Sequence, residues 1–189
     1  MHNTGIPAAQ ALEKLKDGNK RYIDASTNPG DVSPAIRKKT CDEGQFPYAI
    51  VITCSDSRVI PEAVFSAGIG EIFTIRVAGN VMDNHQLGSV QYAAEHLGTR
   101  LVVVLGHTHC GAVGAAMGSG EPEEYVKTLT DEIKKAIGGE KDELTACRKN
   151  VERSVSIIKD RLGYKGGADD AVNTIGAIYD IESGKVEFL

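Results

Sequence analysis

Three short and almost continuous runs of apolar, often β-branched residues constrain the fold of this chain most strongly. They cover residues 48–53, 72–77 and 101–105. Strands that are apolar on both faces are typical of a parallel sheet covered by helices on both sides. Helical patterns at 61–67 and 84–97 separate the runs. The order strand, helix, strand, helix, strand therefore predicts an α/β fold.

Helical segments are predicted on both sides of this strand-rich middle. Residues 7–24 have the amphipathic pattern of a helix, and 25–47 are predicted to form a connection with one short helix near 34–39. A helix is predicted at 111–117, directly after the third strand. Two longer helical stripes follow it, with apolar members Val126, Leu129, Ile133 and Ile137, and then Leu144, Cys147, Val151, Val155, Ile158 and Leu162.

The end of the chain predicts a final pair of strands, at 174–179 and 185–188, around a turn at 182–184. We therefore expect a single domain over residues 1–189. It would consist of an N-terminal helical arm and connection (1–47) and an α/β core with a helical C-terminal half (48–189). The central sheet is expected to be mostly parallel and flanked by helices, with an extending N-terminal helix.

Composition narrows the range of partners. The chain has 189 residues, of which 41% are hydrophobic, enough for one globular core. A formal charge of -5 provides no electrostatic attraction for nucleic acid or an anionic membrane. No apolar run approaches the roughly 20 residues that cross a bilayer. The N-terminal stretch lacks the apolar core of a secretory signal, so a cytoplasmic location is expected.

The four cysteines are too few and too scattered for the disulfide framework of a small secreted domain. Cys41 lies in a polar stretch and Cys147 on a helical stripe, and both are expected to be ordinary free thiols. The other two follow predicted strands. Cys54 comes after the first strand, and Cys110 comes three residues after His107, at the end of the third.

Parallel sheets bind ligands at the carboxyl ends of their strands, so Cys54, His107 and Cys110 are expected to meet there. Two thiolates and one imidazole suit zinc, and three protein ligands leave one coordination position open for chemistry. We therefore predict one Zn²⁺ per chain in an enzyme. His109 is an alternative imidazole ligand; we prefer His107 and expect His109 to face solvent.

Asp56 and Arg58 follow Cys54 within one tight turn. A bidentate pair with Arg58 would hold the Asp56 carboxylate ionised and oriented, able to accept a hydrogen bond from zinc-bound water or hydroxide. At lower pH, Asp56 is expected to become the fourth zinc ligand and close the site. Gly111 begins a helix whose free N–H groups favour an anion, so we expect an anionic product.

Three spaced motifs now agree with one known family. The patterns C-x-D-x-R at 54–58, R-x-A-G-N at 76–80 and H-x-x-C-G at 107–111 resemble the β-class carbonic anhydrases. The resemblance implies reversible hydration of CO₂ to bicarbonate and a proton by zinc-bound hydroxide. It implies a homodimer or higher homo-oligomer with the pocket at a dimer interface, lined by Gln45, Phe73 and Tyr92. Residues 117–164 match the family less well.

Two other classes of function stay open. A hydrolase of carbon disulfide or carbonyl sulfide is possible on the same scaffold, because zinc hydroxide attacks these linear molecules too. A structural zinc module or a cysteine redox protein is the second class. Such proteins usually carry close pairs such as C-x-x-C, which this chain lacks.

Overall fold

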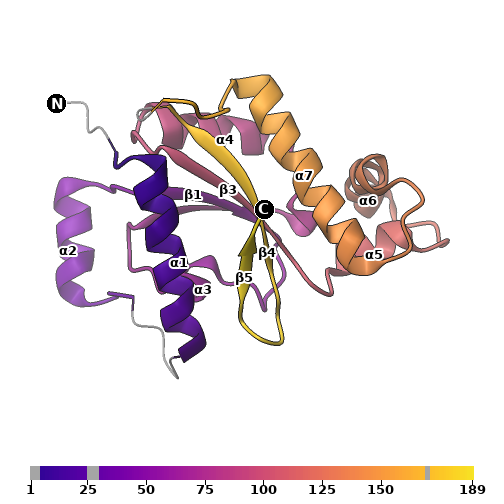
Figure 1. Ribbon diagram of the computed structural model, residues 1–189, viewed down its shortest axis with the longest axis horizontal. Coiled ribbons are helices and arrows are strands. Elements are labelled where there is room, and N and C mark those ends of the chain that lie inside the picture. The colour runs from indigo at the N-terminus through magenta and orange to yellow at the C-terminus, as the bar shows by residue number, and fades with distance from the viewer. Residues whose placement is uncertain (1–4, 25–29, 169–170) are drawn as a thin grey trace.

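The computed structural model of the chain describes residues 5–24, 30–168 and 171–189 (Figure 1). Its five strands form one sheet in the order β2-β1-β3-β4-β5. The strands are β1 (Ala49–Thr53), β2 (Ile72–Arg76), β3 (Leu101–His107), β4 (Asn173–Tyr179) and β5 (Val186–Phe188). The first four run parallel, and β5 pairs antiparallel with β4. The predicted α/β fold with a mostly parallel sheet is confirmed.

Helices cover both faces of this sheet. They are α1 (Ala8–Asp24), α2 (Pro34–Glu43), α3 (Pro61–Val64), α4 (Asn84–Glu95), α5 (Gly111–Met117), α6 (Glu124–Ile137) and α7 (Glu143–Leu162). Figure 1 shows α1 and α2 toward one end of the molecule and α5, α6 and α7 toward the other. A short 3₁₀ turn, η1 (Ala78–Asn80), follows β2 and was not predicted from the sequence.

Two hydrophobic layers sandwich the strands, because successive side chains of a strand point to opposite faces. Ile50 and Val102 point to the face covered by α4, α5, α6 and α7. Their neighbours Val51 and Val103 point to the face covered by α1 and α3. All four side chains are fully buried, which explains why the strand sequences are almost continuously apolar.

Most element boundaries agree with the sequence prediction to within two residues. The helix predicted at 61–67 ends at Val64. The short helix predicted near 34–39 continues to Glu43. The third strand continues beyond Leu105 to His107, because His107 pairs with Tyr179 of β4. This extension makes His107 the last residue of a fully buried strand.

The N-terminal helix α1 packs closely on the core. Leu15 is fully buried, and Asn19 donates hydrogen bonds to the carbonyls of Val64 and Gly184. Gly18 allows this approach, because a Cβ atom there would lie 1.9 Å from the carbonyl oxygen of Phe65. The arm is therefore anchored to α3 and to the C-terminal hairpin.

The substitution Gly18→Ala is expected to destabilise the protein. Alanine normally stabilises a helix interior by about 0.5–1 kcal/mol relative to glycine, but overpacking costs about 1–3 kcal/mol and should dominate against a rigid backbone carbonyl. The matched control is Gly88→Ala in α4, where a Cβ would meet nothing within 4 Å. Urea unfolding should show a loss of stability for the first variant and a small gain for the second. Equal gains would contradict the close packing of α1.

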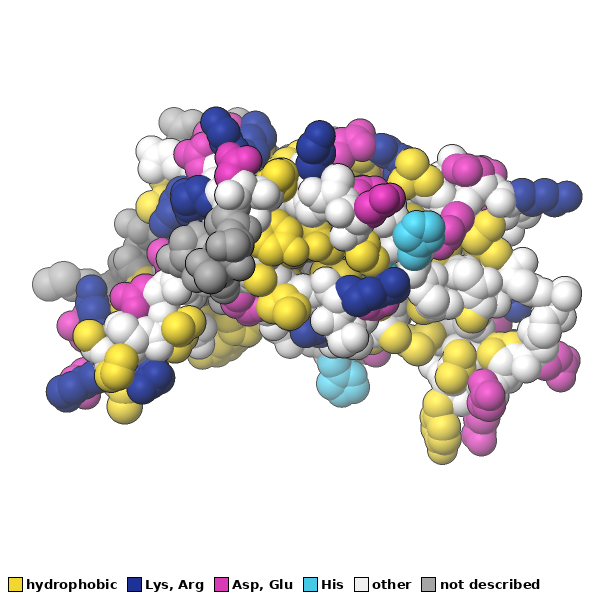
Figure 2. All heavy atoms as spheres, turned by 90° about the horizontal axis from the view of Figure 1, so that it is seen from below, with side chains coloured by type: hydrophobic (Ala, Val, Ile, Leu, Met, Phe, Trp, Pro, Cys, Tyr) yellow, Lys and Arg dark blue, Asp and Glu magenta, His cyan; other side chains and the backbone are white. Residues whose placement is uncertain are grey.

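The surface carries mixed charge. On the face shown in Figure 2, acidic and basic side chains alternate and apolar side chains gather near the middle. None of the helices in the described ranges combines the length and apolarity that a membrane crossing needs.

Candidate metal centre

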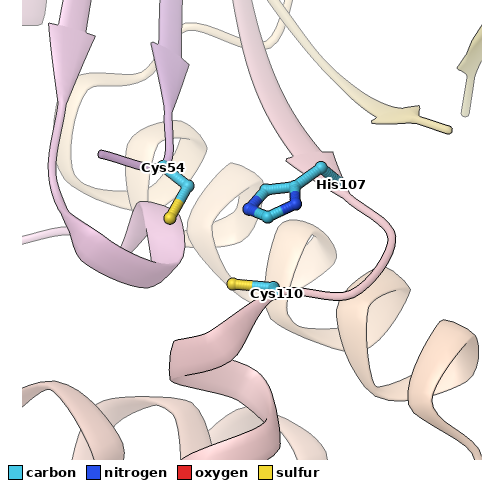
Figure 3. A group of neighbouring side chains, drawn as sticks. All are labelled: Cys54, His107 and Cys110. Atoms are coloured by element: carbon cyan, nitrogen blue, oxygen red, sulfur yellow. The ribbon is translucent and has the colours of Figure 1, made fainter. Parts of the chain in front are cut away.

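Three side chains from two strand ends point toward one another at the carboxyl edge of the sheet (Figure 3). They are Cys54, directly after β1, His107, the last residue of β3, and Cys110, just before α5. Their ligand atoms lie within 4.8 Å of one another. The exposed fractions of the three residues are 4%, 0% and 2%, so the cluster is almost completely shielded from solvent.

The imidazole of His107 is oriented by the backbone carbonyl of the next residue, Thr108. Its Nδ1 atom lies 2.8 Å from the carbonyl oxygen of Thr108, which can only accept, so Nδ1 carries the proton. Nε2 is buried and has no hydrogen-bond partner among the described residues. A bare, buried nitrogen lone pair is costly unless a ligand occupies it. This is the arrangement that a metal-binding histidine requires.

The two neighbouring sulfurs differ in acidity. The nearby Cys110 thiol lowers the pKa of Cys54, and this effect outweighs that of burial. The nearby Cys54 sulfur, together with burial, raises the pKa of Cys110. Without a cation, the pair therefore holds one negative charge more readily than two. A bound divalent cation would allow both sulfurs to ionise, since metal binding displaces thiol protons.

This donor set fits zinc. Tetrahedral Zn²⁺ with bonds of about 2.0–2.3 Å needs ligand atoms roughly 3.5–4 Å apart, which the cluster reaches with small side-chain movements. Two sulfurs and one imidazole nitrogen suit this borderline-soft ion. The three protein ligands are one fewer than structural zinc sites normally use. The cluster therefore has the composition of a catalytic site with an open position.

The carboxylate of Asp56 is held in a fixed orientation beside this cluster. Arg58 donates from Nε to Oδ1 at 2.9 Å and from Nη2 to Oδ2 at 2.7 Å, and its backbone N–H also donates to Oδ1. The hydrogen bonds from the Arg58 side chain hold the pKa of Asp56 well below its usual range. Asp56 is thus favoured as a charged hydrogen-bond acceptor, and the predicted bidentate pairing with Arg58 is present.

Two guanidinium groups join the loops that carry the ligands. Arg58 also donates to the carbonyl of His109 at 3.0 Å, linking the turn after β1 to the loop after β3. Arg76, at the end of β2, donates to the carbonyls of Cys54 at 3.2 Å and Asp56 at 2.7 Å. These hydrogen bonds link the turn after β1 to the end of β2 and to the loop after β3, and so hold the backbone around the cluster in place.

Comparisons with known proteins agree with this geometry. A sequence model of the family described as "Carbonic anhydrase" matches residues 49–186. The carbonic anhydrase of Mycolicibacterium smegmatis is 35% identical over 189 residues, covering 94% of this chain and 91% of that protein. Carbonic anhydrase 2 of Mycobacterium tuberculosis is 32% identical over 197 residues, covering 98% and 93%. The chain belongs to the β-class carbonic anhydrase family.

Solved structures of β-carbonic anhydrases share the fold. A structure reported among two tetrameric β-carbonic anhydrases of Sordaria macrospora has a TM-score of 0.71 at 22% identity, covering 96% of this chain and 94% of that one. CafA of Aspergillus fumigatus has a TM-score of 0.68 at 24% identity, covering 96% and 89%. The match to the family model and the relatives at 32–35% identity confirm the predicted family and an enzyme of the carbonic anhydrase type.

The structure of this β-class carbonic anhydrase distinguishes between the two histidines that were candidate ligands, because only His107 belongs to the cluster. His109 does not belong to the cluster with the two sulfurs. Its side chain is 70% exposed and lies 3.4 Å from the carboxylate of Glu143.

The structure also shows where Gly111 and the cysteines lie. Gly111 is exposed at the first position of α5. All four cysteines lie in the described ranges and are free.

The predicted pocket residues lie away from the cluster within one chain. Gln45 is exposed and lies before β1, whereas Cys54 follows that strand, which is about 17 Å long. Phe73 pairs in register with Ile50, also toward the far end of β1. The ring of Tyr92, which is 48% exposed, lies 6.2 Å from that of Phe73, centroid to centroid. A single chain does not bring these side chains to the metal centre.

Two hydrogen bonds near the metal centre were not predicted from the sequence. The backbone N–H of Gly79 donates to the Cys54 sulfur at 3.2 Å, and Asn150 of α7 donates to the carbonyl of Gly79 at 2.7 Å. The R-x-A-G-N motif marked Arg76 and Gly79 as a family pattern without indicating their role. For Asn150, the sequence showed only a polar residue beside an apolar helical stripe.

Proposed function

We propose that this protein binds one Zn²⁺ through Cys54, His107 and Cys110 and catalyses the reversible hydration of CO₂ to bicarbonate and a proton. The observation that carries this proposal is the unpartnered, buried Nε2 of His107 beside two cysteine sulfurs. When bound, zinc supplies the positive charge that makes water nucleophilic near neutral pH. The expected cytoplasmic location stays a prediction.

Asp56 has the properties of the group that orients the attacking water. Its low pKa keeps it a hydrogen-bond acceptor at any pH at which the enzyme would work. Arg58 fixes its direction and offsets its charge. The predicted closed state, with Asp56 as the fourth ligand, requires the carboxylate to leave Arg58. The observed ion pair supports the proposed open site.

We also propose that the working unit is at least a homodimer in which Gln45, Phe73 and Tyr92 line the partner's substrate pocket. Within one chain these residues lie away from the cluster, and Tyr92 leaves about half of its surface exposed. A second copy would cover this aromatic surface and bring it to the metal. The tetrameric relatives from Sordaria macrospora support an assembly of this kind.

Metal analysis and a substrate assay of the purified protein test the proposal together. We expect one zinc per chain, a particle mass of at least two 20.1 kDa chains, and rapid hydration of CO₂. Carbon disulfide and carbonyl sulfide should be assayed in parallel, because zinc-activated water attacks all three. If the protein turned over the sulfur compounds and did not hydrate CO₂, the proposed substrate would be wrong. If the purified protein contained no metal, the proposed metal site would be wrong.

A further inference from the structure

The turn η1 lies between the metal centre and α7, and α7 holds it with two buried side chains. The amide of Asn150 donates from Nδ2 to the carbonyl of Gly79 at 2.7 Å. The hydroxyl of Ser154, one helical turn further along, donates to the carbonyl of Asn80 at 2.9 Å. Both residues are only 2% exposed. Since the two hydrogen bonds are alike in depth and length, they provide a matched pair for comparison.

The other side of Gly79 faces the metal centre. Its N–H donates to the sulfur of Cys54 at 3.2 Å, in a buried contact. Gly79 has φ 70° and ψ 15°, the left-handed conformation that glycine adopts without strain. Because glycine has no strong backbone preference of its own, its contacts decide where its N–H points. On the carbonyl side, the only side-chain hydrogen bond among the described residues comes from Asn150, and the N–H of the same peptide group, from Asn80, donates to the carbonyl of Val77 at 2.9 Å.

Packing leaves no room for another residue at this position. A Cβ on Gly79 would lie 2.7 Å from Cδ1 of Ile133 in α6 and 3.1 Å from Cβ of Ala112 in α5. The turn is thus enclosed by three helices, and its N–H is kept away from water that would compete for it. A hydrogen bond in such a shielded place is stronger than one on the surface.

We propose that Asn150 is a positioning residue of the metal centre, which holds the Gly79 N–H against the Cys54 sulfur and thereby limits the electron density that this sulfur gives to the metal. Hydrogen bonds to a ligating sulfur tune the electronic properties of metal sites in general. The inference rests on the proposed metal at Cys54. It assigns a function to α7.

Replacing the zinc with cobalt allows the effects of Asn150 and Ser154 on the metal centre to be compared. In Asn150→Ala, the thiolate-to-cobalt charge-transfer band should move to lower energy, because a sulfur without its donor gives up an electron more readily. The affinity for zinc, measured by competition with a chelator, should fall by about tenfold to a hundredfold, because the Cys54 sulfur is no longer held in position, and this loss outweighs its stronger electron donation. In Ser154→Ala, both readouts should stay as in the unaltered protein, although a buried hydrogen bond is lost there too.

A second variant removes the donor without leaving a cavity. Asn150→Leu keeps the approximate volume of the side chain and should shift the cobalt band in the same direction as Asn150→Ala. Equal shifts in the Asn150 and Ser154 variants would show a general loosening of η1 and overturn the proposal. So would unchanged spectra in folded Asn150 variants.

The unaltered protein provides a test that does not depend on any variant folding. In protein loaded with ¹¹³Cd, a hydrogen bond from Gly79 to the ligating sulfur should produce scalar coupling between the metal and the Gly79 amide proton. Metal bound without this coupling would overturn the inference and leave the proposed function standing. Failure to bind any metal would count against the proposed function itself.

Discussion

Replacing His107 with alanine is expected to abolish both metal binding and CO₂ hydration. The side chain is fully buried, and among the described residues it is the only imidazole in the cluster with the two sulfurs. Without it, two thiols of unequal acidity remain, and they provide too few ligands for a stable tetrahedral site. Zinc content should fall from one per chain to a trace, and the hydration rate should fall to that of the buffer.

The control for this variant is His109→Asn on the same loop. His109 has φ 56°, and asparagine tolerates this left-handed conformation better than alanine does. The variant should keep its zinc and most of its activity, since the His109 side chain faces solvent and only its carbonyl is used by Arg58. Metal loss in the His109 variant, or metal retained by folded His107→Ala, would reverse the assignment of the two histidines. Urea unfolding of both variants checks that the fold persists.

The strands and the metal ligands could be predicted because their signals are local. A run such as Leu101–Val104 is apolar on both faces whatever its neighbours are, and the carboxyl ends of parallel strands meet by topology. Cys54 and His107 could therefore be brought together from residues 53 positions apart without any coordinates. The spacing of Asp56 and Arg58 likewise allowed their pairing to be predicted, because one turn contains both partners.

The features that could not be predicted depend on distant contacts. The helix at 61–67 ends early because Ser66 takes a left-handed φ of 48° and donates its hydroxyl to the carbonyl of Gly18 in α1. Asn150 approaches Gly79 from 71 positions away in sequence. An asparagine on a helix has no local property that distinguishes a partner for a buried carbonyl from a solvated side chain. Such contacts become visible only when the packing of α7 against η1 is known.

Replacing Asp56 with asparagine is expected to leave zinc bound and to remove most of the turnover. Asparagine is nearly isosteric, but its amide nitrogen would face the donors of Arg58, and it has no charge with which to accept a hydrogen bond from the attacking water. Misplacing a reacting group can cost about 10²-fold in rate, so kcat/KM for CO₂ should fall by about that order. Zinc content, measured on the same sample, should stay at one per chain.

Asp31→Asn is the matched control for Asp56→Asn. Asp31 accepts the backbone N–H of Ser33 in the same way that Asp56 accepts that of Arg58, but on an exposed turn outside the metal centre. Both variants therefore change a carboxylate that stabilises a turn, and only one changes the proposed acceptor. A structural role for Asp56 would make the two variants alike, with normal turnover in folded, zinc-loaded protein. Loss of turnover confined to Asp56→Asn would separate catalysis from the stability of the turn, because the metal, the fold and the turn type are all retained.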